Sequence, residues 1–147
     1  MKIPKINIGK LLNQIDAYGA ESQRLAVAVT NSTADEIVSN ARQRVVVDLG
    51  QLRQSIGSTK ASVGNNRSFI FANAPYAAYV EFGTGGLVSV PKGFEQIAIK
   101  FKGKGVKKIN LRPRPYLIPS YLLGLNEYSK RLVKMFDRIS KQYNNKK

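Results

Sequence analysis

A stripe of apolar residues near the end of the chain is the feature that most constrains its fold. Aromatic and aliphatic residues recur there at steps of three and four, at Tyr121, Leu125, Tyr128, Leu132, Phe136 and Ile139. This is the period of an α-helix that buries one face. Prolines at positions 113, 115 and 119 lie just before most of the stripe, and proline is tolerated in the first turn of a helix. We therefore expect an amphipathic helix from Ser120 to Gln142, about 35 Å long.

A second long helix is expected from about Ile8 to Val45. Residues recur there at helical spacing, at Leu11, Ile15, Tyr18, Ser22, Leu25, Val29, Thr33, Ile37 and Ala41. Several of them are polar or small, which predicts a half-buried helix. Gly19 and the polar cluster at 30–33 could break or bend it, and Ser32 or Thr33 could cap a second helical segment.

The middle of the chain indicates β structure. Residues 56–63 fit a weak strand, residues 64–66 (Gly-Asn-Asn) are typical of a turn, and residues 69–71 (Phe-Ile-Phe) are apolar on both faces, as in a central strand. Together these segments predict a β-hairpin. The alternation at Ile97, Ile99 and Phe101 predicts one further strand. Residues 76–82 fit either a helix or a strand, and residues 51–55 fit one helical turn.

Positive charge is the strongest signal in the composition. The chain has 24 Lys and Arg residues against nine Asp and Glu residues, a net charge of +15, which predicts association with polyanions or with acidic protein surfaces. A basic loop at about 87–112 holds the candidate contact residues Lys100, Lys102, Lys104, Lys107 and Lys108. These lysines could contact DNA phosphates, face an acidic neighbour or remain solvated. A short basic tail at 143–147 is expected to fray.

The composition removes much of the chemistry that enzymes use. The chain contains no cysteine and no histidine, which excludes disulfides, thiolate chemistry, the common zinc ligands and histidine acid–base catalysis. Its nine carboxylates are scattered, and Asp35-Glu36 is the only adjacent pair. We therefore expect no catalytic residue, no metal and no cofactor. No apolar run approaches the roughly 20 residues that span a bilayer, so no membrane contact is expected.

Glu81 is a carboxylate within an apolar run. It has no second carboxylate nearby in the sequence, so an ion pair with a residue such as Arg53 or Arg114 is favoured over a catalytic acid. Asp48 is interpreted as a turn or helix-cap residue. The glycine-rich residues 83–86 could cradle a phosphate, but they lack the Gly-Lys-Ser/Thr ending of a P-loop. A turn that needs positive φ is the simpler interpretation.

The aromatic residues Tyr76, Tyr79 and Phe82 fall at helical spacing. They could form a platform on which nucleic-acid bases stack. A stripe that packs in the core or against another subunit is the favoured interpretation, because aromatic residues are enriched at interfaces as well as in cores.

Three segments and the C-terminal helix together resemble the tail-component, or neck and tail-completion, proteins of long-tailed bacteriophages. The segments are VDLGQLRQSI at 47–56, YAAYVEFGT at 76–84 and RPRPYLIP at 112–119. The second of them is the most specific. The chain departs from the family pattern at Leu49, where Thr is usual, and in a longer, more basic loop between residues 86 and 111.

This resemblance implies an α+β fold in which a twisted antiparallel sheet is flanked by a long N-terminal helix and a long C-terminal amphipathic helix, within one domain over 1–147. It implies a virion protein at the head–tail junction. Identical subunits would form a ring, six-fold like the tail tube, between the head-closure or connector proteins and the tail tube or terminator, and viral DNA would pass through it. No catalytic residue carries over. The expected interface residues are Asp48, Leu52, Arg53, Tyr76, Tyr79, Glu81, Phe82, Arg112, Arg114 and Tyr116.

Two other classes of function compete with this interpretation. A sequence-independent nucleic-acid-binding protein fits the charge, although the chain has no helix-turn-helix, zinc-finger or RRM signature. A basic nuclease would need a metal site built from carboxylates, and the sequence contains no carboxylate cluster. The nucleic-acid-binding protein is therefore the stronger alternative.

Overall fold

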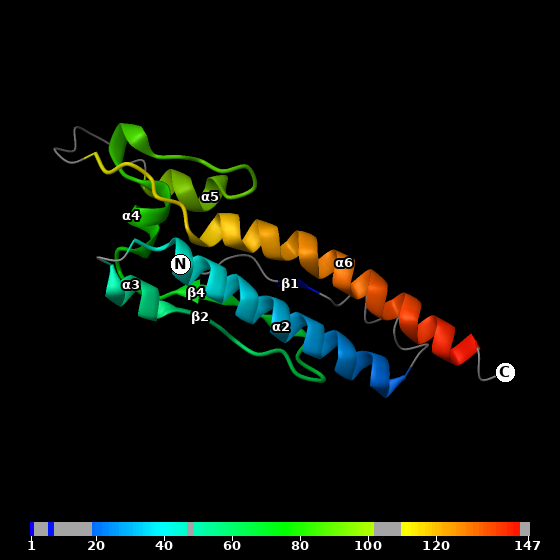
Figure 1. Ribbon diagram of the computed structural model, residues 1–147. Helices are drawn as coiled ribbons and strands as arrows, with labels where there is room; N and C mark the ends of the chain where they lie inside the picture. Colours follow the sequence, from blue (N-terminus) through cyan, green and yellow to red (C-terminus); the bar gives the residue numbers. More distant parts are fainter. Residues whose placement is uncertain (2–5, 8–18, 47–48, 102–109, 145–147) are drawn as a thin grey trace.

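Two long antiparallel helices lie side by side along the length of the molecule (Figure 1). They are α2 (Ala20–Arg44) and α6 (Leu117–Asn144). The structure is a computed structural model, and it describes residues 1, 6–7, 19–46, 49–101 and 110–144. The elements expected at 8–18 and the tail at 145–147 lie outside these residues.

The amphipathic helix predicted near the end of the chain is confirmed as α6. Tyr121, Tyr128, Leu132 and Ile139 are buried, and Leu125 and Phe136 pack against the core from half-buried positions. The helix begins three residues earlier than expected, at Leu117. Pro119 therefore falls inside its first turn, where no intrahelical N–H bond is lost.

The polar cluster at 30–33 does not break α2, which is continuous from Ala20 to Arg44. The Thr30 and Thr33 hydroxyls donate to the carbonyl oxygens of Ala26 and Val29, each at 2.8 Å. The Thr30 hydroxyl also lies 3.1 Å from the Tyr128 hydroxyl on α6. The predicted cap at Ser32 or Thr33 is wrong, because Thr33 is satisfied by the preceding turn of its own helix.

Close approach of the two helices depends on Gly124 in α6. A Cβ atom at this position would overlap the Cγ1 and Cδ1 atoms of Ile37 in α2. Ile37 is fully buried and has no room to move aside. The glycine therefore lets the helices come closer than any larger residue would allow.

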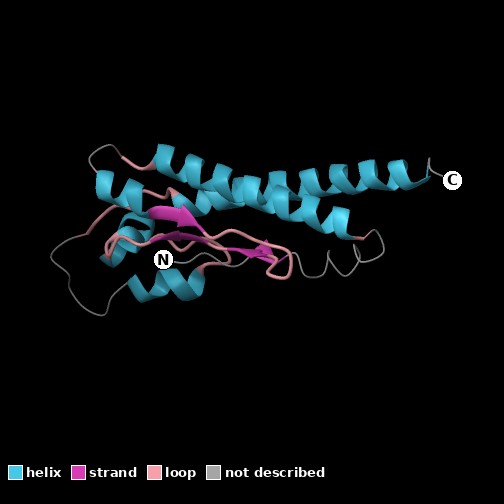
Figure 2. Cartoon of the chain, turned by 90° about the horizontal axis from the view of Figure 1, so that it is seen from below, coloured by secondary structure: helices cyan, strands magenta, loops and turns pink. Residues whose placement is uncertain are grey.

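The β structure consists of two short antiparallel pairs on one side of the helix pair (Figure 2). Strand β2 (Ile56–Ser58) pairs with β4 (Ile70–Ala72), and β1 (Ile6–Asn7) pairs with β3 (Arg67–Ser68). The predicted hairpin is confirmed, with its turn closed by the Ser62–Asn65 bridge. The central-strand interpretation of residues 69–71 fits the pairing. Ala72 pairs with Ile56 in β2 and also exchanges two hydrogen bonds with Met1, and β3 pairs with β1. Helix α2 covers the β2–β4 pair.

The remaining helices of the described residues are short: α3 (Gly50–Ser55), α4 (Ala77–Phe82), η2 (Gly85–Leu87), α5 (Glu95–Ala98) and η3 (Ile99–Phe101). The helical turn expected at 51–55 is confirmed, and the ambiguous 76–82 segment is a helix. The strand predicted around residues 97–101 is wrong. Phe94 and Ala98 are buried four residues apart and Ile99 is 62% exposed, which is helical rather than alternating burial.

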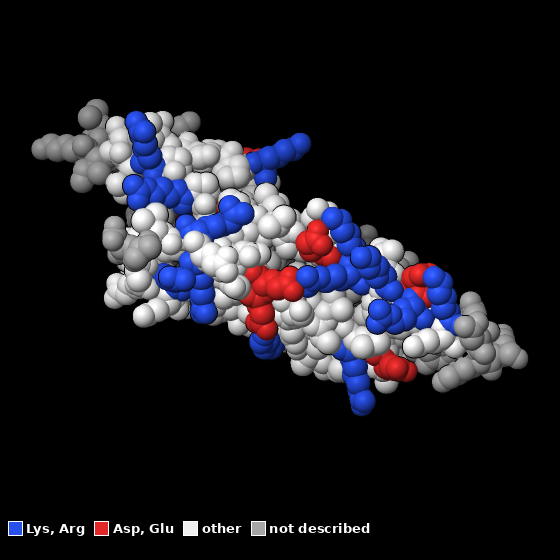
Figure 3. Space-filling model, in the orientation of Figure 1, with Lys and Arg blue, Asp and Glu red and all other residues white. Residues whose placement is uncertain are grey.

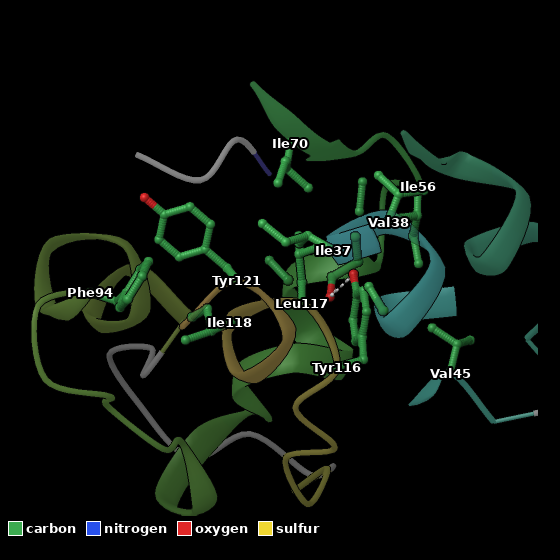
Figure 4. Close-up of a cluster of buried hydrophobic side chains, with 14 of the residues drawn as sticks. Ile37, Val38, Val45, Ile56, Ile70, Phe94, Tyr116, Leu117, Ile118 and Tyr121 are labelled. Carbon is green, nitrogen blue, oxygen red and sulfur yellow. Dashed lines mark hydrogen bonds between the residues drawn. The ribbon is translucent and has the colours of Figure 1, made fainter. Parts of the chain in front are cut away.

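The core joins both helices to the sheet (Figure 4). Ile37 and Val38 come from α2, Ile56 and Ile70 from the strands, and Leu117 from the first turn of α6. One hydrophobic core thus holds all the layers, and the predicted α+β fold with two long flanking helices is confirmed.

Candidate functional site

Two of the segments that resemble phage proteins lie against each other at one end of the molecule. The Arg114 N–H donates to the Val80 carbonyl at 2.8 Å, and the Thr84 N–H donates to the Leu111 carbonyl at 3.0 Å. The Leu111 N–H donates in return to the Thr84 hydroxyl at 2.9 Å. The 76–84 segment and the chain leading into α6 are thus joined as one local unit, although about thirty residues separate them in the sequence.

The buried side chain of Glu81 also joins these two segments. Its side chain is 1% exposed, and its Oε2 atom accepts hydrogen bonds from the N–H groups of Tyr116 at 2.8 Å and Leu117 at 2.9 Å. Its Oε1 atom accepts one from Ile118 at 3.0 Å. These N–H groups belong to the start of α6, where no intrahelical acceptor exists and where negative charge is favoured. The expected ion pair with Arg53 or Arg114 is replaced by this cap.

Burial sets the electrostatics of the capped site. Desolvation raises the pKa of the Glu81 carboxyl above its ordinary value, and the three backbone amides pull it back in part. Burial, with the neighbouring Glu81, raises the pKa of the Tyr116 hydroxyl. Both side chains are fixed by the fold and face away from solvent, so neither is placed to exchange a proton with a bound molecule.

Gly83 allows the two segments to approach. Its φ angle is 77°, and a Cβ atom there would lie 2.6 Å from the Leu111 carbonyl oxygen. Only glycine meets both conditions without strain. The turn with positive φ expected at 83–86 is therefore confirmed, and part of its backbone already bonds to the chain before α6.

A half-open groove of about 480 Å³ lies over the contact between residues 76–84 and the chain leading into α6. Its walls are Leu49, Tyr76, Tyr79, Val80, Asn110, Leu111, Arg112 and Arg114. All three resembling segments, or residues directly beside them, contribute to it, so we call it the motif groove. Tyr79 is 39% exposed and packs edge to face on Phe101, with ring centroids 5.2 Å apart. The groove therefore offers an apolar, partly aromatic floor.

The structure divides the expected interface residues into two groups. Leu52, Glu81, Phe82 and Tyr116 are buried in the core of this chain, where no second molecule reaches them. Tyr76, Tyr79, Arg112 and Arg114 come together at the motif groove. Arg53 is exposed on α3, and Asp48 lies outside the described residues. Tyr76, Tyr79 and Phe82 were interpreted as a stripe that packs in the core or against another subunit. Phe82 lies in the core, and Tyr79 lies at the surface.

The candidate lysines are mostly beyond what the structure describes. Lys100 is exposed in η3, and Lys102, Lys104, Lys107 and Lys108 fall within residues 102–109. Four groove residues were not among the predicted site residues, namely Leu49, Val80, Asn110 and Leu111. Each of these lies inside a resembling segment or within two residues of one, and this adjacency was the available signal.

On the face that Figure 3 shows, Lys and Arg side chains lie at the end that carries α3 and α4 and also along α6, while acidic side chains lie over the middle and toward the opposite end. Exposed ion pairs join Asp35 to Lys60, Glu36 to Arg131, Glu127 to Lys130 and Asp137 to Lys141. The motif groove, in contrast, has two arginines and no acidic residue in its described walls.

The described ranges contain no candidate metal site and no candidate membrane span. No three residues of the His, Cys, Asp and Glu types lie close enough there to hold a metal ion. Nor is any helix in this part of the chain both long and apolar enough to cross a membrane.

The chain matches a known protein family. The family model described as "Bacteriophage HK97-gp10, putative tail-component" matches residues 9–83. No curated protein and no solved structure gives a significant match. The matched range covers just over half of the chain and includes α2, the hairpin and the residues of α4. The chain therefore belongs to this family of structural bacteriophage tail components.

Proposed function

We propose that this chain is a ring-forming subunit at the head–tail junction of a long-tailed bacteriophage. Six copies would close a neck or tail-completion ring between the head-closure or connector proteins and the tail tube or terminator, and the viral genome would pass through it. Closed rings arise when each subunit presents two different complementary surfaces to its neighbours. Membership of the tail-component family supports this role.

One structural observation carries the proposal. The described residues of the segments that resemble phage proteins are divided between a buried interior and an exposed groove. Glu81 and Gly83 fix the shape, whereas Tyr79, Arg112 and Arg114 face outward. Such an arrangement suits a part whose task is to present a surface of defined shape to other proteins.

Contact with DNA in this proposal is transient and independent of sequence. Lys100 and the lysines at 102, 104, 107 and 108 would meet phosphates as the genome passes. Because phosphate contacts release counterions, they weaken steeply as salt rises. Weak contacts of this kind let DNA move through a ring without stalling it.

Locating the chain in the particle tests the proposal. We expect density for it between the head and the tail in images of intact virions, and unjoined heads and tails in lysates of a phage that lacks its gene. Density elsewhere along the tail, or absence from purified particles, would reject the junction role.

The net charge of +15 favours one alternative, a sequence-independent nucleic-acid-binding protein. A mobility-shift assay with random DNA and RNA separates the two functions. Tight binding by the monomer with a steep salt dependence supports the alternative. Weak binding, together with a ring that forms when virion proteins are added, supports the junction subunit.

A further inference from the structure

The motif groove combines two features that together define a ligand. Leu49, Val80 and Leu111 give it an aliphatic surface, and Leu111 is 48% exposed. Arg112 and Arg114 are exposed along the same walls, and neither has an ion-pair partner among the described residues. An apolar surface beside unpaired guanidinium groups is complementary to an apolar side chain flanked by carboxylates.

The backbone beside the groove has little capacity to pair with a strand from another protein. Pro113 and Pro115 have no N–H group. The N–H groups of Leu111 and Arg114 are already bonded to Thr84 and Val80. Recognition would therefore come mainly from side chains, so the two arginines and the apolar walls should determine which segment binds.

We propose that the motif groove binds an acidic segment of another virion protein, in which an aromatic or large aliphatic residue is flanked by Asp or Glu. The apolar residue would enter the groove, and the flanking carboxylates would form forked hydrogen bonds with Arg112 and Arg114. This inference rests on the proposed function, since it names the chemistry of a partner at the junction.

Charge argues against a second copy of this chain as the occupant. Each copy carries 24 Lys and Arg residues against nine Asp and Glu residues, so few of its segments could offer carboxylates to the two arginines of the groove. The acidic side chains that the structure describes are largely engaged already. Four of them pair with lysine or arginine of the same chain, and Glu81 is buried under α6.

The shape of the groove argues against nucleic acid. A nucleic-acid strand is bound along a track of cations with aromatic faces for its bases. The motif groove is instead a single hollow of about 480 Å³, whose walls combine three aliphatic residues, two tyrosines, one asparagine and two arginines. This volume accommodates one or two side chains better than a sugar–phosphate backbone.

Peptide binding by the full chain tests the inference. The probe is a short fluorescein-labelled synthetic peptide with one phenylalanine flanked by glutamates, measured by fluorescence polarisation at physiological salt. One control peptide has glutamine in place of glutamate, and another has alanine in place of phenylalanine. We expect the acidic phenylalanine peptide to bind at least tenfold more tightly than either control, because both parts of the groove contribute.

Matched variants identify the surface that binds. The double variant Arg112→Gln with Arg114→Gln should weaken binding of the acidic phenylalanine peptide at least tenfold. The control double variant Lys134→Gln with Arg138→Gln removes the same charge from exposed positions on α6 and should change binding less than about twofold, as expected for remote charges screened by salt. Leu111→Ser should weaken the phenylalanine peptide and leave the alanine peptide unchanged. Circular dichroism checks that each variant is folded.

Several results would overturn the inference. The first is an equal loss of binding in both double variants. The second is binding of the alanine peptide as tight as that of the phenylalanine peptide, and the third is no binding of any peptide. The fourth is competition for the groove by a random oligonucleotide that depends on Arg112 and Arg114. Each leaves the junction role intact, because location in the virion is measured separately. A chain that binds the acidic peptide through the groove but is absent from particles would instead reject the proposed function.

Discussion

The α2–α6 pair and the motif groove end are stabilised in different ways. Along the helix pair, the apolar stripe of α6 packs beside buried small and polar residues of α2 such as Thr30 and Ala34, and burial repeats with the helical period. At the groove end, one carboxylate and a few backbone groups carry the structure. The Glu81 carboxylate alone accepts three N–H groups at the start of α6.

This contrast shows how sensitive each region is to single changes. Packing along a long interface is spread over many residues, so one substitution removes a small share of it. A cap formed by one buried side chain has no substitute when that side chain is lost. The groove end should therefore be the more fragile region, although it contains fewer residues.

Loss of the Glu81 carboxylate should have the largest effect. Glu81→Ala leaves three buried N–H groups without an acceptor, and we expect a loss of about 3 kcal/mol in the free energy of unfolding. Urea denaturation followed by circular dichroism measures it. The matched control is Glu95→Ala, which removes an exposed carboxylate bonded to the Gly93 N–H and should have little effect. Similar losses for the two variants would show that the cap is unimportant.

A substitution at the most crowded position of the helix pair should have a smaller effect on stability. Gly124→Val places side-chain atoms where Ile37 lies, and overpacking of this kind costs about 2 kcal/mol. The control Asn126→Val introduces the same residue at an exposed position of α6, which isolates the cost of a β-branched residue in a helix. Equal urea midpoints for the two variants would mean that the helices can move apart freely.

The same contrast explains what the sequence could predict. Period alone identified α6, because six apolar residues at steps of three and four exclude a strand. The period also predicted α2. The polar cluster at 30–33 does not break this helix, because its buried threonines bond to the preceding turn. Three alternating residues at 97–101 were too few to separate a strand from short helices, and there the prediction was wrong.

The structure of the groove end could not be predicted from residue patterns, for a physical reason. The partners of Glu81 are backbone N–H groups, which every residue except proline has, so no side-chain pattern marks them. The groove itself forms only when Leu49, Tyr79 and Arg112 meet in space. Resemblance to phage proteins selected segments that line the motif groove, but it did not separate buried residues such as Leu52 and Tyr116 from surface residues such as Arg114.

A hydrogen bond between the two long helices should contribute a smaller amount. Thr30→Val removes the hydroxyl that lies 3.1 Å from the Tyr128 hydroxyl, and we expect a loss of about 1 kcal/mol. Tyr128→Phe should cost a similar amount. The double variant should lose less than the sum of the single losses, because no hydroxyl is then left unpaired. Strict additivity in urea denaturation would show that these two hydroxyls do not interact.

The smallest effect concerns pH and arises again at Glu81. Burial raises the pKa of this carboxyl above its ordinary value of 4.5, so the folded chain holds the proton more tightly than the unfolded chain does. The contribution of this group to stability is therefore fully present below pH 4.5 and is lost as the pH rises through the raised pKa. Glu81→Gln cannot titrate, and it serves as the reference. The stability of the natural chain relative to this variant should fall modestly in urea denaturation as the pH rises from below 4.5 through the raised pKa. A rise over the same interval would mean that the three amides outweigh burial, and that the cap depends on an ionised carboxylate.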